Sequence, residues 1–221
     1  SAPRAMGVID PLELELVNWE EVFGGAPTEA CTAPVHPHRP ELGQRAFSLG
    51  PRLWIDRQDF AEVPVNGEHR LTPGEHVRLK YGFIVECLGS RKNEQGQVVS
   101  VQARVLPGTK SGTPDAEQTK VKATITWVGL HEAVAAEIRL FEHLFVVPRM
   151  DEVDDGDFRR HLNPTSRRIA HGWVEPTLAA LAPEQHVQLE RLGYFVSDRC
   201  DHRTDAAVFN RVTSLRGPRP R

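Results

Sequence analysis

Residues 77–87 read Val-Arg-Leu-Lys-Tyr-Gly-Phe-Ile-Val-Glu-Cys, with an apolar side chain at every odd position. Alternation with a period of two is typical of a strand that buries one face. The opposite face would carry His76, Arg78, Lys80 and Glu86. A loop with Asn93 and Gly96 follows, and apolar residues alternate again from Val99 to Val105. The two runs predict a long antiparallel hairpin.

The same alternation recurs along the chain. Further predicted strands cover Leu12–Leu16, Lys120–Trp127, Ile169–Val174, Val187–Val196 and Val208–Leu215. Residues 137–145 fit either a strand or a helix by their apolar spacing. In the run from Val187 to Val196 the apolar positions change parity, which predicts a β-bulge at Glu190-Arg191. No internal repeat is evident.

Composition narrows the class of protein. The 221 residues are 39% apolar and 26% charged, which excludes a membrane protein and a disordered chain. The 17 Pro and 17 Gly lie between short apolar runs, as in a turn-rich, all-β fold. Short strands at this density, without alternating helices, predict antiparallel barrels or sandwiches, and two barrels of about 100 residues each suit the length.

Charge and cysteine content bear on partners and compartment. The net charge is −3, so nucleic-acid binding would require a local basic patch rather than an overall positive field. The three cysteines lie far apart, which favours a reducing compartment, and no signal segment is evident. We therefore expect a cytoplasmic protein. The start at Ser1 without Met suggests a trimmed chain.

A metal-assisted hydrolase is one alternative. His36 and His38 could supply ligands together with the acids of Asp151–Asp157. No His, Cys or Glu partner stands at a recognised spacing, and the acidic run lacks the pattern of a calcium loop. A solvated loop is the simpler interpretation. Phosphate-binding glycine loops and the nucleophile motif G-x-S-x-G do not occur.

Several ordered motifs resemble the C-terminal part of the glutaminyl-tRNA synthetase family. They are Arg4-Ala5-Met6 with Val8-Ile9-Asp10-Pro11, Trp54-Ile55-Asp56-Arg57, Val77-Arg78-Leu79, Lys120-Val121-Lys122, Glu137-Ile138-Arg139-Leu140, Gln188-x-Glu190-Arg191-x-Gly193-Tyr194-Phe195 and Phe209-Asn210-Arg211. The resemblance covers nearly the whole chain. It implies an anticodon-binding region of two antiparallel β-barrels related to ribosomal protein L25, with residues 137–145 as a strand.

The resemblance also implies how the chain is divided between the two barrels. Residues 1–18 with 140–221 would form the barrel proximal to a catalytic body, and residues 19–139 the distal barrel. The nucleotide fold of the family is not matched here, so the resemblance places no catalytic residue or metal ligand in this chain. ATP with Mg²⁺ would belong to the missing catalytic domain, and the role of residues 17–34 is open.

Site residues follow from the resemblance position by position. The tRNA anticodon contacts would be Arg4, Arg70, Arg78, Lys80, Gln188, Glu190 and Arg191, with weaker matches at His38, Gly67, His69 and Arg216. Arg4, Gln188, Glu190 and Arg191 match the residues around the middle anticodon base. Arg70 matches the arginine at the third base, where a guanidinium can bond guanine O6 and N7 as a fork. Arg78 matches the arginine at the first base, and Lys80 replaces a usual arginine.

The implied partners are glutamine tRNA and the catalytic domain of the same parent chain, with the protein expected as a monomer without membrane contact. A stand-alone L25-like RNA-binding module and the β-barrel anticodon domain of a glutamyl-tRNA synthetase are the alternatives.

Overall fold

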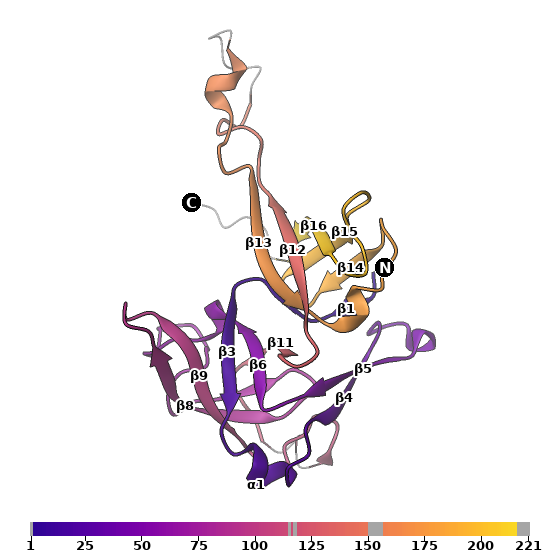
Figure 1. Cartoon of the computed structure of the whole chain (residues 1–221). Coiled ribbons are helices and arrows are strands. Elements are labelled where there is room, and N and C mark those ends of the chain that lie inside the picture. Colours follow the sequence, from indigo (N-terminus) through magenta and orange to yellow (C-terminus); the bar gives the residue numbers. More distant parts are fainter. Residues whose placement is uncertain (1, 115, 117–118, 150–156, 216–221) are drawn as a thin grey trace.

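The computed structural model describes residues 2–114, 116, 119–149 and 157–215. Two seven-stranded sheets each curl into a nearly closed barrel, and a two-stranded hairpin lies beside them (Figure 1). This confirms the predicted all-β fold with two barrels. The strands are β1 (Arg4–Ala5), β2 (Gly7–Val8), β3 (Pro11–Leu16), β4 (Glu29–Pro34), β5 (Gln44–Leu49), β6 (Arg52–Asp56), β7 (His76–Leu79), β8 (Ile84–Lys92), β9 (Val98–Val105), β10 (Thr124–Ile125), β11 (Trp127–Gly129), β12 (Val134–Phe141), β13 (Arg167–Val174), β14 (His186–Leu189), β15 (Gly193–Ser197) and β16 (Ala207–Ser214). The helices are short: α1 (Trp19–Phe23) and the 3₁₀ turns η1 (Pro40–Leu42), η2 (Arg57–Asp59), η3 (Phe158–His161) and η4 (Pro176–Leu178).

The two barrels draw on different parts of the chain. The central barrel has the strand order β10-β7-β8-β9-β3-β6-β11 and takes all its strands from residues 11–129. The terminal barrel has the order β1-β14-β15-β16-β12-β13-β2 and uses residues 4–8 and 134–214. Most neighbouring strands are antiparallel, but each barrel also contains two parallel pairs.

The boundaries between the two barrels differ from those that the resemblance implied, which were at residues 18/19 and 139/140. β3, at residues 11–16, pairs with β6 and β9 in the central barrel. β12 begins at residue 134 and pairs with β13 and β16 in the terminal barrel. Which barrel lies nearer a catalytic body stays a prediction.

The two sheets have the same strand order, and they exchange their first two strands. β1 and β2 directly precede the five long strands of the central barrel, yet they pair in the terminal barrel. β10 and β11 directly precede β12–β16, yet they pair in the central barrel. The repeat that the sequence did not reveal is visible in β7 and β14, which read His-Val-Arg-Leu and His-Val-Gln-Leu at equivalent places.

Alternating burial explains why these segments form strands. In β3 the side chains of Leu12, Leu14 and Leu16 are buried, while those of Glu13 and Glu15 point outward. Each barrel encloses its own apolar cluster, and the central one also takes in Met6, between the exchanged strands β1 and β2, and Val8 of β2. Burying these apolar side chains supplies the main driving force for folding.

Some predicted strands are shorter or interrupted. The run 77–87 is not one strand but β7, a turn and β8, and residues 187–196 form β14, a turn and β15. The predicted bulge at Glu190-Arg191 is therefore wrong: the parity change marks the turn of a hairpin. The ambiguous residues 137–145 are largely strand, because β12 covers 134–141, as the resemblance implied. β12 and β13 belong to the terminal barrel, and the described residues between them, 142–149 and 157–166, project away from it (Figure 1).

The open segment 17–34 has two parts. In α1 the ring of Trp19 packs against that of Phe23, and Phe23 lies edge-on to Phe83 of the central barrel. β4 then pairs along its whole length with β5. The segment thus packs on the central barrel through α1 and supplies one strand of the hairpin β4–β5, which reaches toward the terminal barrel (Figure 1). Among the described helices, none is long and apolar enough to cross a membrane.

Candidate nucleic-acid interface

Two tight turns meet where the barrels touch. The turn after β7 contains Lys80 and Tyr81, and the turn after β14 contains Glu190 and Arg191. Tyr81 and Arg191 adopt left-handed backbone angles, with φ of 62° and 67°. The Tyr81 hydroxyl donates to the Glu190 carboxylate at 3.0 Å, and Lys80 Nζ lies 3.1 Å from Glu190 Oε2. The carboxylate of one barrel therefore holds the turn of the other.

Arg4 and Gln188 complete this group. They are register partners in the parallel pair β1–β14, and Arg4 Nε donates to Gln188 Oε1 at 3.1 Å. The backbone N–H of Arg4 also donates to Val35 O, at the end of β4. The structure thus brings together Arg4, Lys80, Gln188 and Glu190, four of the seven main site residues that the resemblance implied. We call these four the inter-turn site.

A buried arginine that the sequence analysis did not single out lies behind this site. Arg45 of β5 is 7% exposed and binds Glu190 and Glu175 at 2.9 Å each. Its signal in the sequence is positional: in β5 it shares the buried parity of Phe47 and Leu49, where a charged side chain is unexpected. The sequence analysis also did not identify Tyr81 and Glu175 as residues of this site.

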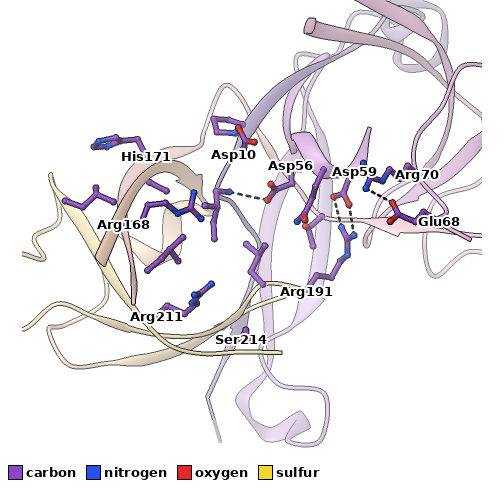
Figure 2. A pocket seen from close by; sticks show the side chains of 18 of the residues that line it. Asp10, Asp56, Asp59, Glu68, Arg70, Arg168, His171, Arg191, Arg211 and Ser214 are labelled. Carbon is purple, nitrogen blue, oxygen red and sulfur yellow. Dashed lines mark hydrogen bonds and ion pairs between the residues drawn. The ribbon is translucent and has the colours of Figure 1, made fainter. Parts of the chain in front are cut away.

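Beside the inter-turn site, a pocket of about 1090 Å³ opens between the barrels (Figure 2). Gly67, His69 and Arg70 line it from the central barrel, and Arg191 lines it from the terminal barrel. These are four further residues that the resemblance implied. Three basic side chains that it did not imply also line the pocket, namely Arg168 and His171 of β13 and Arg211 of β16.

The charges in this pocket are mixed. Arg191 makes a two-pronged ion pair with Asp59, with N–O distances of 2.6 and 2.7 Å (Figure 2). Arg70 Nη2 lies 2.5 Å from Glu68 Oε2. Asp56 is buried, and this burial raises the pKa of its carboxyl to about 6, although the N–H of Ile9 donates to it. Two guanidinium groups of the pocket are therefore paired with carboxylates, which hold them in fixed orientations.

Arg78 and Lys80 have different partners, and only Lys80 binds Glu190. β7 ends at Leu79, and the Arg78 guanidinium turns to the loop after β9. It donates to the carbonyl oxygens of Thr109 and Ala116 at 2.9 Å each. Burial lowers the pKa of this guanidinium. Arg78 keeps the outward parity of β7, and both it and Lys80 are half-buried rather than fully exposed. A contact of Arg78 with the first anticodon base stays a prediction.

The remaining implied residues are peripheral or outside the described part. His38 is exposed in the loop between β4 and β5, where its N–H donates to the His36 ring at 3.1 Å. Arg216 and Asp151–Asp155 lie outside the described residues. Among the described residues, no group of three His, Cys, Asp or Glu side chains is placed to hold a metal ion.

Comparisons with known proteins agree on one family. Residues 2–106 and residues 124–198 each match a family model described as "tRNA synthetases class I (E and Q), anti-codon binding domain". The second match begins at Thr124, the first residue of β10.

Curated relatives match over nearly the whole chain. A glutamine–tRNA ligase of Ralstonia nicotianae is 47% identical over 215 residues, or 97% of this chain and 36% of the relative. Those of Cupriavidus metallidurans and Bordetella pertussis are each 46% identical with the same coverage. The chain thus spans about a third of the length of these relatives.

Proposed function

Since this chain belongs to the anticodon-binding domains of the class I (E and Q) tRNA synthetases, we propose that it binds the anticodon loop of glutamine tRNA. It would serve as the recognition part of a glutamine–tRNA ligase. Glutamine is favoured over glutamate because the relatives described above are glutamine–tRNA ligases.

The observation that carries this proposal is the pocket between the barrels. Arg70 and Arg191 come from different barrels and line the same cavity. RNA loops are read through unstacked bases that enter such pockets and bond to side chains along their edges. Arginine forks suit guanine edges and phosphates, which fits an anticodon loop better than a small neutral ligand.

Binding of short RNA hairpins tests the proposal. The purified chain is titrated with the anticodon stem–loop of glutamine tRNA, three variants that each replace one anticodon base, and the stem–loop of glutamate tRNA. A wrong base at a well-read position costs about 1–3 kcal/mol, or roughly 5- to 150-fold in affinity. We expect such a loss at one anticodon position or more. Equal affinity for all five hairpins would refute the proposal, and a preference for the glutamate hairpin would favour a glutamyl enzyme.

Arg70→Lys tests the implied role of a single side chain. Lysine keeps the charge but cannot form the fork, so discrimination at the third anticodon base should fall to near one while binding to the wrong base changes little. Arg104→Lys is the matched control, because Arg104 is an exposed arginine whose Nε lies 2.6 Å from Glu86, outside the pocket. Equal losses for the right and the wrong hairpin would mean that Arg70 only binds the backbone.

The wider setting is part of the same proposal. The relatives are ligases, and we propose that the ATP and Mg²⁺ chemistry resides in the rest of such a ligase, so that this chain alone does not charge tRNA. We also propose a cytoplasmic monomer. Glutamine attachment by the purified chain would contradict the first point, and sedimentation at a dimer's mass would contradict the second.

A further inference from the structure

We propose that Arg45 is a positioning residue that fixes the inter-turn site before RNA binds. The inference rests on the proposed function, because it assumes that this site contacts RNA. Arg45 touches none of the pocket's open surface: its side chain is 5% exposed. Its effect would pass through Glu190 and through β1.

Three directions of contact surround the Arg45 guanidinium. Nη2 donates to Glu190 Oε1 at 2.9 Å, and Nε donates to Glu175 Oε2 at 2.9 Å. Nη1 donates to the carbonyl oxygen of Pro34 at 2.8 Å, which ties the hairpin β4–β5 into the same network. The rings of Phe47 and Tyr81 lie 5.6 and 5.3 Å from the guanidinium carbon, so aromatic faces close the remaining sides.

Both carboxylates that Arg45 binds control a backbone segment of the site. Glu190 lies in the turn that also presents Arg191, and it accepts from Tyr81 of the facing turn. Glu175 accepts the backbone N–H of Met6 at 2.7 Å, directly after β1, which carries Arg4. One buried cation therefore holds the turn 190–192 and the strand that presents Arg4.

Charge balance makes Arg45 hard to replace. Glu175 and Glu190 are 2% and 3% exposed, and Lys80 is the second cation within 4 Å of Glu190. Burial, and to a smaller extent the charge of Glu190, raise the pKa of Glu175, and the contacts with Arg45 and Met6 counteract this rise. Without Arg45 a buried carboxylate would lack its counter-ion, and such groups take up a proton or move toward water. Either response releases the turn or β1.

The test compares Arg45→Met with Arg52→Met. Arg52 is the matched control because it makes the same kind of pair with Glu13, at 2.6 Å, but its side chain is 56% exposed and lies outside the site. Arg45→Met/Glu175→Gln is a second variant, in case Arg45→Met does not fold. It removes the buried carboxylate that Arg45→Met alone would leave without its counter-ion. Each protein is titrated with the hairpins described above. Glu190→Gln and Arg70→Lys first identify which anticodon position each substitution affects.

Selective loss is the expected result. Both Arg45 variants should lose at least about fivefold of the discrimination at the position that Glu190→Gln affects. They should keep, within about threefold, the discrimination at the position that Arg70→Lys affects, because a general weakening would lower both. Arg52→Met should change neither. An Arg45 variant that keeps full discrimination at the Glu190 position, or loses it equally at every position, overturns the inference.

A measurement without RNA separates this inference from the proposed function. Amide hydrogen exchange of Met6 and of residues 190–193 should speed up at least 10-fold in the folded Arg45 variants and stay unchanged in Arg52→Met. If these amides exchange as in the wild type, Arg45 does not position the turn, whatever RNA the chain binds. If these amides exchange faster while the wild type binds all hairpins with equal affinity, the proposed function fails, but the positioning of the turn by Arg45 stands.

Discussion

Asp56 is a buried carboxyl group at the end of β6, between the two barrels, and it lines the pocket. Burial raises its pKa from 3.8 to about 6, so the folded protein holds a proton that the unfolded chain releases between these values. The folded state binds more protons, and this group therefore lowers stability as the pH rises through that window. At neutral pH the carboxylate is ionised in both states, and its burial destabilises the fold.

Asp56→Asn should stabilise the protein at pH 7.5 by up to about 3 kcal/mol, the equivalent of about two pKa units. The amide oxygen can still accept from the Ile9 N–H, whose donor lies 3.2 Å away. Urea unfolding at pH 7.5 and at pH 4 checks this, because the gain should shrink toward the lower pH. Asp10→Asn, at an exposed neighbour whose charge contributes only a small part of the raised pKa of Asp56, should give a much smaller gain. A variant less stable than the wild type at pH 7.5 would contradict the assignment.

The site shows why single residues are hard to predict from sequence. Period-two alternation correctly indicated which positions of β3 and β7 are buried, because one face of a strand must leave water. Arg45 and Glu175 stand 130 residues apart, and no local pattern links them. Arg78 follows the outward parity but bonds to a loop 31 residues away. Long-range polar contacts depend on the tertiary fold and not on local spacing.

At the scale of elements, turns were the hardest feature to predict. The tight turn Leu79–Gly82 keeps the odd apolar parity of its flanking strands, so residues 77–87 look like one continuous strand. Its left-handed residue is Tyr81, where glycine or asparagine would have given a turn signal. After β14 the left-handed residue is Arg191, and the parity shift there resembled a bulge. Two short hairpins therefore appeared as two long strands.

Gly172 determines how closely β2 can approach β13. Gly172 pairs with Ala136 of β12 on one side. A Cβ built on Gly172 would overlap the carbonyl oxygen of Val8 in β2. Gly172→Ala should therefore push β2 away from the terminal barrel and destabilise the protein by about 3 kcal/mol. Urea unfolding measures the loss.

Gly96→Ala is the control for this substitution. Gly96 lies in the loop between β8 and β9 with φ of 76°, and a Cβ there would meet nothing within 4 Å. Its cost should be only the left-handed backbone strain of about 1–2 kcal/mol. If Gly172→Ala costs no more than Gly96→Ala, the close approach of β2 does not limit this position.

On the scale of the whole molecule, the barrels are joined by exchanged strands and by a polar and aromatic interface. The indole rings of Trp54 in β6 and Trp173 in β13 stack at 5.6 Å with planes 7° apart. Arg191 and Asp59 add an ion pair between the barrels. Two barrels were expected from the density of short strands and the chain length. The exchange was not expected, because β1, β2, β10 and β11 have only two or three residues each. Such short runs carry no periodicity.

The exchange makes the two barrels unequal when the chain is cut. Residues 10–132 contain all seven strands of the central barrel, so this fragment should fold alone, with reduced stability because Met6 and Val8 leave its core. Residues 133–215 lack β1 and β2, which leaves β13 and β14 with unpaired edges. This fragment should not fold cooperatively.

Residues 1–9 joined to residues 133–215 through a Gly/Ser linker of about ten residues should restore folding, since such a linker is flexible enough to replace the central barrel. Dispersed amide resonances and a cooperative urea transition are the readouts, and a fusion with residues 1–9 in scrambled order is the control. Cooperative folding of 133–215 alone, or equal behaviour of the native and the scrambled fusion, would show that the exchanged strands are dispensable to the terminal barrel.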